Sequence, residues 1–227
     1  MRFPPCSTAS TASLRIRSLS AFSLIELLVV VAILGILAAV TVPAISSMLG
    51  AKGVGRGLSD VASVLEFARA EAMARRTYVY VGFENATNAN GNAELRVAAA
   101  ASPDGSAATT AGVLPISRVV RLENVRQTNY SGLPPVVQAA AAGASDNADY
   151  VTGMTAGVEF TNGQQVFSGS MVVVSPEGEL LPGAASRVFL ERAYVGLVGM
   201  RGDVPANNDG GVVAYDGGSG AITIMRP

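Results

Sequence analysis

The sequence predicts an α+β protein, in which a long amino-terminal hydrophobic helix packs by its carboxyl-terminal half on an antiparallel β-sheet domain. Three observations predict it. Leu27–Val42 carries no charge, apolar residues recur at steps of three and four over Leu58–Arg76, and an alternation of period two begins after Arg76. One long helical pattern followed by strands is the element order of an α+β fold.

Composition narrows the possible functions. The chain has 227 residues, 49% hydrophobic and 15% charged, with a net charge of −1. It contains no histidine and a single cysteine, Cys6, so catalysis by an imidazole base, zinc centres of His and Cys, and an internal disulfide are all excluded. The balanced charge argues against a nucleic-acid partner. We expect no enzymatic activity and no cofactor.

The first element is a basic segment followed by an apolar one. Residues 1–21 contain Arg2, Arg15 and Arg17 and no acid, and Phe22–Ile45 follows. As a helix, this second segment would reach about 36 Å, which exceeds a hydrocarbon core of about 30 Å. Basic residues before a span place the amino terminus in the cytoplasm, so we expect a single-pass inner-membrane protein with its carboxyl-terminal domain outside.

Two plain interpretations compete for this segment, a cleaved secretory signal and a simple signal anchor. The apolar run is longer than the core of a signal peptide, and apolar residues continue after Pro43. Neither interpretation explains Glu26, a carboxylate within an otherwise apolar run, because a charge inside a membrane is costly.

The string Ala21-Phe22-Ser23-Leu24-Ile25-Glu26-Leu27 resembles the processing site of type IV prepilins and type II secretion pseudopilins. The resemblance implies that residues 1–21 are a leader, that prepilin peptidase cuts between Ala21 and Phe22, and that the new amine of Phe22 is methylated. The family usually has Gly before the cut, where this chain has Ala21. Pro43 lies where many pilins place a helix-kinking proline.

The resemblance also implies a role in assembly. The free amine of Phe22 in one subunit would pair with the Glu26 carboxylate of its neighbour. Breaking such a pair leaves a charge unpaired in apolar surroundings, so the pair would fix the register between stacked helices more than it would add to their net stability. The implied partners are prepilin peptidase, other pilins or pseudopilins, and an inner-membrane assembly platform.

Residues 46–76 are expected to form a hinge and an amphipathic helix. Pro43 should kink the helix. Gly50, Gly53, Gly55 and Gly57 each lower helix propensity, so Leu49–Gly57 is predicted to melt. The helix should resume at Leu58 with one apolar face that packs on the sheet.

Residues 77–227 are expected to form the exposed β-rich domain. Strands are predicted at Tyr78–Phe83, Leu95–Ala99, Ile116–Leu122, Gln165–Val174, Val188–Leu197, Val212–Tyr215 and Ile222–Met225. Hairpin turns are predicted at Ser175–Gly178 and Asp216–Gly220. The stretches 85–112 and 138–149 are rich in Ala, Asn, Ser and Gly and are predicted to be exposed loops.

This order resembles the H-type minor pseudopilins, the GspH/FimT-like group. The segment Val174-Ser175-Pro176-Glu177-Gly178-Glu179-Leu180 is similar to a turn in the late sheet of that group, with Val in place of its Phe. The whole chain is also similar to a pilin-like cassette protein D group of Verrucomicrobia. The resemblance implies a structural minor subunit of a type IV pilus or a type II secretion pseudopilus.

Two alternatives keep the anchor and change the role. One is a non-polymerising binding protein, a receptor for DNA or an exoprotein, for which Arg118, Arg121 and Arg126 are the only local basic cluster. The other is an anchored hydrolase that uses carboxylates. We predict no metal site, with Asp203 and Asp209 as weak calcium candidates in a glycine-bounded loop.

Overall fold

The computed structural model describes residues 24–107, 112–144, 146, 149–154, 158–183 and 189–227. Contacts within the chain divide it into two units, Met1–Ala44 and Ile45–Pro227. One helix, α1 (Leu24–Arg75), begins in the first unit and ends in the second, and all of the strands belong to the second. The order of one long helix followed by antiparallel strands confirms the predicted α+β class.

The helix α1 is continuous over 52 residues, so the predicted melted segment at Leu49–Gly57 is wrong. The glycines serve close packing instead. A Cβ built on Gly53 would lie 3.7 Å from the Glu123 carbonyl oxygen, and one on Gly57 would lie 3.4 Å from Leu122 Cδ1. Val54 and Leu58 beside them are buried, and their burial offsets the low helix propensity of glycine.

The first sheet follows α1 directly in the chain. Its strands are β1 (Val79–Thr87), β2 (Ala93–Ala101), β3 (Leu114–Pro115), β4 (Val120–Glu123), β8 (Ser170–Val174) and β9 (Leu180–Leu181). The order is β3-β2-β1-β8-β9, with β4 also paired to β2, and every pairing is antiparallel. The central register places Val81 opposite Ala99 of β2 and Val172 of β8.

The second sheet has the order β12-β11-β10-β5, again antiparallel. Its strands are β5 (Val125–Thr128), β10 (Arg192–Arg201), β11 (Val204–Asp216) and β12 (Ile222–Met225). A separate hairpin pairs β6 (Phe160–Asn162) with β7 (Gln165–Phe167). Short helices lie at η1 (Tyr130–Gly132), α2 (Pro135–Ala140), η2 (Ala142–Ala144) and η4 (Val151–Gly153).

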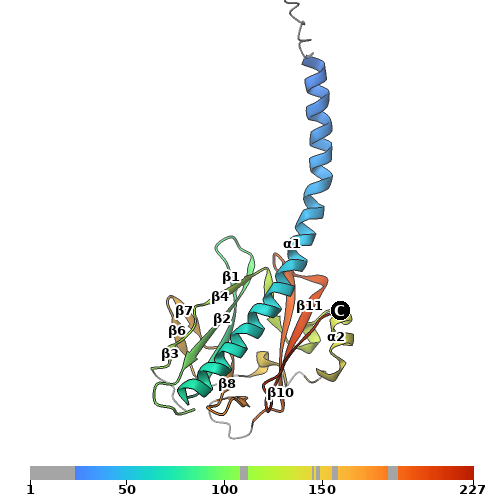
Figure 1. Cartoon of the computed structure of the whole chain (residues 1–227). Coiled ribbons are helices and arrows are strands. Elements are labelled where there is room, and N and C mark those ends of the chain that lie inside the picture. Colours follow the sequence, from blue (N-terminus) through green and yellow to red (C-terminus); the bar gives the residue numbers. More distant parts are fainter. Residues whose placement is uncertain (1–23, 108–111, 145, 147–148, 155–157, 184–188) are drawn as a thin grey trace, which may run out of the picture. The chain divides into compact units, whose positions relative to one another are not determined.

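The main core lies between the carboxyl-terminal part of α1 and one face of both sheets. In Figure 1 this part of the helix crosses in front of the two sheets, with β1 and β2 on one side and β10 and β11 on the other. The apolar stripe predicted from the sequence supplies it: Leu58, Val61 and Leu65 are buried against residues such as Val97 and Leu197. The amphipathic helix packed on sheet is therefore confirmed.

The outer face of each sheet is covered by later parts of the chain. Phe160 and Phe167 of the β6–β7 hairpin stack with ring centroids 4.9 Å apart, in a cluster with Tyr80 of β1. On the second sheet, Val137 of α2 packs with Tyr150 and Tyr194. Both sheets are thus sandwiched between α1 and a covering element.

A side chain ties the two sheets together. Asn85 of β1 donates from Nδ2 to the Gln127 carbonyl oxygen of β5 at 3.1 Å, and its Oδ1 accepts from the Gln127 N–H at 2.8 Å. The amide thus satisfies both backbone groups of Gln127, as a neighbouring strand would do.

Several of the predicted boundaries of loops and strands were wrong. The loop predicted at 85–112 contains the end of β1 and all of β2. Ala98–Ala101 are buried, in alternation, in the core under α1 and in the cluster with the β6–β7 hairpin. The loop predicted at 138–149 begins inside α2. Within the strand predicted at Ile116–Leu122 only the last three residues are strand, as part of β4, and β3 lies before that range. The strand predicted at Gln165–Val174 is divided into β7 and β8.

Candidate functional site

The amino-terminal part of α1 is the first candidate site. Glu26 lies in the first turn of the helix, where the helix dipole favours a negative charge, and it is exposed. The predicted processing residues Ala21 and Phe22 lie outside the described residues. The geometry of the proposed Phe22–Glu26 pairing is therefore a prediction that awaits experiment.

The residues after Glu26 form an apolar helix without a polar side. Each large apolar residue between Leu24 and Leu37 exposes 45–83% of its surface, and the run Leu27–Val31 is exposed at five successive positions, which point around the whole helix. A helix that is apolar on every side requires an apolar environment from a membrane or from other helices. Among the residues that the structure describes, no helix was found that is both long enough and apolar enough to cross a membrane.

Pro43 lies within the bounds of α1, at the border between the two units. The helix is not broken there. The kink predicted at Pro43 stays a prediction.

The two weak calcium candidates are engaged with arginines. Asp203 Oδ1 lies 3.1 Å from Arg126 Nη2, and Asp209 Oδ1 lies 3.5 Å from Arg226 Nη2. Burial raises the pKa of Asp209, against the opposing effect of Arg226. Within the described ranges, no group of three or more His, Cys, Asp or Glu side chains is placed to hold a metal ion.

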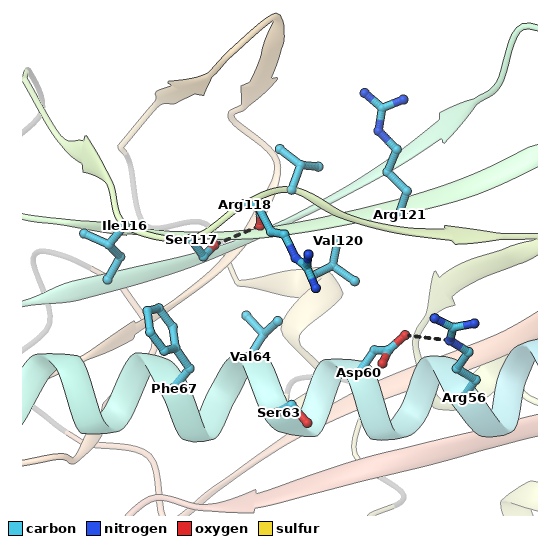
Figure 2. A pocket seen from close by; sticks show the side chains of 11 residues that line it. Arg56, Asp60, Ser63, Val64, Phe67, Ile116, Ser117, Arg118, Val120 and Arg121 are labelled. Carbon is cyan, nitrogen blue, oxygen red and sulfur yellow. Dashed lines mark hydrogen bonds and ion pairs between the residues drawn. The ribbon is translucent and has the colours of Figure 1, made fainter.

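The basic cluster predicted at Arg118, Arg121 and Arg126 is divided by the structure. Arg126 belongs to β5 and pairs with Asp203. Arg118 and Arg121 line an open groove of about 660 Å³ between α1 and the segment 116–121, and α1 contributes Arg56, Asp60 and Phe67 to the same groove. Figure 2 shows Arg118 turned toward the helix and Arg121 pointing away from it. Sequence reasoning missed this groove because its walls are about 55 residues apart in the chain.

Buried tyrosines mark the interior of the second unit. Burial raises the pKa of Tyr80 to about 12, with Asp104 and Tyr78 adding smaller effects, and its hydroxyl donates to the Ala107 carbonyl at 2.9 Å. Burial also raises the pKa of Tyr150 above its ordinary value. Both tyrosines are fully buried, and neither lines the groove.

Comparison with known proteins gives one match in the amino-terminal segment. Residues 17–42 match the prokaryotic N-terminal methylation motif, which covers the end of the predicted leader, Glu26 and the following apolar helix. A search of the curated proteins found no match.

A solved structure is also similar to this chain, the type IV minor pilin FimU of Pseudomonas aeruginosa (strain PAO1). The identity is 10%, the alignment covers 77% of this chain and 88% of that chain, and the TM-score is 0.33. A TM-score this low does not by itself establish a common fold. The prokaryotic N-terminal methylation motif at residues 17–42, which runs into the start of a 52-residue helix, supports a type IV pilin-like amino-terminal segment.

Proposed function

We propose that this chain is a structural minor pilin or pseudopilin subunit, incorporated through its amino-terminal helix into a type IV pilus or a type II secretion pseudopilus. The observation that carries the proposal is the methylation motif at residues 17–42. The exposed apolar surface of α1 from Leu24 to Leu37 supports it, because a free-standing soluble domain does not present such a surface.

Processing creates the group that assembly needs. Prepilin peptidase cuts between Ala21 and Phe22 on the cytoplasmic side and methylates the new amine. Before the cut this nitrogen is part of a neutral amide, and after it the nitrogen is a cation that pairs with Glu26 of a neighbouring subunit. Inside a bundle of apolar helices an unpaired carboxylate is costly, so the pair selects the register in which each subunit enters.

The apolar helix has two environments in this proposal. Before assembly, the segment Phe22–Ile45 lies in the inner membrane, with the β-rich domain outside. After assembly, the same surface packs against helices of other subunits. The protein has no catalytic role of its own, and the energy for extrusion comes from other components of the machinery.

The mass of the mature amino terminus tests the proposal. The full chain is co-expressed with a prepilin peptidase, extracted from membranes and analysed by peptide mass spectrometry. We expect a mature protein that begins at N-methylated Phe22. An intact leader, or cleavage after the apolar run with release of the domain, would overturn it.

The role of Glu26 needs a separate test. Glu26→Gln keeps the size of the side chain and removes its charge, and Glu191→Gln makes the same change on an exposed residue far along the chain. We expect both variants to be processed, with incorporation into filaments lost only in Glu26→Gln. Normal incorporation of Glu26→Gln would refute the pairing with Phe22.

A further inference from the structure

The groove between α1 and the segment 116–121 has an apolar floor and a basic rim. Phe67 on α1 is 37% exposed and faces Ile116 across the groove, while Val64 lies below Val120 (Figure 2). Its rim carries three arginines and one carboxylate. Arg56 pairs with Asp60 at 3.5 Å, and Arg118 and Arg121 add two further positive charges. Such a surface favours an occupant with an apolar tip between carboxylates.

Arg118 and Arg121 carry positive charges that no carboxylate of the described residues pairs with. In the strand register Arg121 lies opposite Arg96, whose guanidinium is already paired with Glu94. Arg121 therefore has no carboxylate of its own among the described ion pairs, and a carboxylate from outside would offset its charge.

An acidic surface of matching character lies elsewhere on the same unit. The turn between β8 and β9 carries the exposed Glu177 and the partly exposed Glu179 around Gly178. A Cβ on Gly178 would lie 3.1 Å from Met73 Sδ, which places the turn against α1 beside Met73, a residue that is 43% exposed. Glu66 is exposed on the same side of the helix, two turns before Met73.

This acidic knob, made of Glu66, Met73, Glu177 and Glu179, complements the groove in charge and in form. It has three carboxylates against the one guanidinium of Arg69, whose Nε is buried. Within the described part of the chain, none of the three glutamates is in an ion pair. Met73 supplies the apolar tip, and a thioether packs well against an aromatic ring such as Phe67.

The knob and the groove lie on different sides of the molecule. At 3.6 residues per turn and 1.5 Å per residue, the knob residues of α1 are centred about 115° around the helix from its groove residues, and about 11 Å farther along it. One copy therefore uses its knob on one neighbour and its groove on another. A heterologous contact of this kind repeats from one subunit to the next, and it builds an open filament when its rotation does not close into a ring.

We propose that the groove receives the acidic knob of a second copy of this chain, with Glu177 of one subunit against Arg118 of the next. The proposal rests on the proposed function, because the contact repeats only if the subunits are brought together by their helices. It names the surface of the β-rich domain that orders neighbouring subunits.

Cysteine cross-linking tests the contact directly. The full chain with Cys6→Ser carries no other cysteine, so Arg118→Cys and Glu177→Cys together supply the only thiols. The variant is co-expressed with prepilin peptidase, and membrane and filament fractions are oxidised with copper phenanthroline. A disulfide forms only where the two Cα atoms come within about 7 Å of each other. If the contact brings positions 118 and 177 of neighbouring subunits this close, we expect a ladder of disulfide-linked multimers. The matched pair Arg118→Cys and Glu191→Cys should give no ladder.

Charge reversal adds a test that does not depend on disulfide geometry. Arg118→Glu or Glu177→Arg alone should lower the amount of the chain in the sedimented filament fraction at least about fivefold, because like charges then meet at the contact. The two changes together should restore it. Arg201→Glu, an exposed charge reversal at the end of β10, serves as the control, and an unchanged thermal melt establishes that each variant is folded.

The outcomes separate this inference from the proposed function. Processed protein that forms multimers, without the Arg118–Glu177 ladder and with no effect of either reversal, would overturn the contact alone. Unprocessed protein without multimers would overturn both. A groove that instead captures DNA or an exoprotein in a manner lost in Arg118→Glu, while multimers are unchanged, would overturn the contact in favour of the receptor alternative.

Discussion

The glycines of α1 offer a quantitative test of how the helix meets the sheets. Gly53→Ala adds a methyl group that would lie 3.7 Å from the Glu123 carbonyl oxygen, an ordinary van der Waals distance. Alanine is favoured over glycine within a helix by about 1 kcal/mol. We therefore expect the free energy of unfolding to rise by about 1 kcal/mol and Tm by about 2–4 °C.

The neighbouring glycine should behave differently. A Cβ on Gly55 would lie 2.6 Å from Arg226 Nη1, so Gly55→Ala must displace the guanidinium and weaken its pairing with Asp209. A half-exposed ion pair contributes about 0–1 kcal/mol, so its loss offsets much of the gain in helix propensity. We expect Gly55→Ala to leave the free energy of unfolding close to that of the natural chain.

Thermal unfolding of the full chain in detergent measures both variants, with far-UV circular dichroism for the helix and the near-UV tyrosine signal for the β-rich domain. The two substitutions are identical in chemistry and lie two residues apart, so each controls for the other. A Gly53→Ala variant that is no more stable than the natural chain, or a Gly55→Ala variant that gains as much as Gly53→Ala, would refute the packing described for this part of α1.

Three further perturbations probe other parts of the domain. Asn85→Asp places a carboxylate against the Gln127 carbonyl oxygen, to which the Asn85 amide donates, and should lower the free energy of unfolding by about 1–2 kcal/mol in urea titrations. A loss no larger in Asn85→Asp than in Asn85→Ala would contradict the pair of hydrogen bonds between Asn85 and Gln127. Gly220→Ala puts a side chain at φ +70° against the Arg69 guanidinium and should lower Tm by several degrees, and Arg69→Ala in the same chain should recover part of the loss. Because the pKa of Tyr80 is raised, its neutral hydroxyl stabilises the fold below pH 10, and this stability is lost as the pH rises from 10 toward 12. Tyr80→Phe should therefore unfold less steeply in an alkaline titration followed by tyrosinate absorbance. Identical curves for the two proteins would contradict the raised pKa of Tyr80.

The class of the fold and the segment that suggests its function could be predicted from residue patterns. The stripe through Leu58 and Leu65 has helical spacing, the strand at Ile222–Met225 has the predicted bounds, and the turns at Ser175 and Asp216 follow local chemistry. These features depend on neighbours in the chain, which a pattern records directly.

The features that escaped prediction depend on distant partners. Ala98–Ala101 resembles a flexible linker in composition, yet it is a buried strand because α1 and the β6–β7 hairpin close on both of its faces. The glycines near Gly55 resemble a hinge until Arg226, at the other end of the chain, is placed beside them. The basic groove likewise needs both α1 and the segment 116–121 before it exists.

The placement of α1 between two sheets has a consequence for the order in which the protein is made. The β1–β2 hairpin follows the helix at once, so the first half of the core can form locally. Leu197, which helps to complete the core from the second sheet, is synthesised about 140 residues after Leu58. At about 5–20 residues per second, the ribosome leaves one flank of the helix uncovered for roughly 7–28 s. A partner that shields this flank during synthesis would therefore act before the second sheet is made and be released when β10 and β11 arrive.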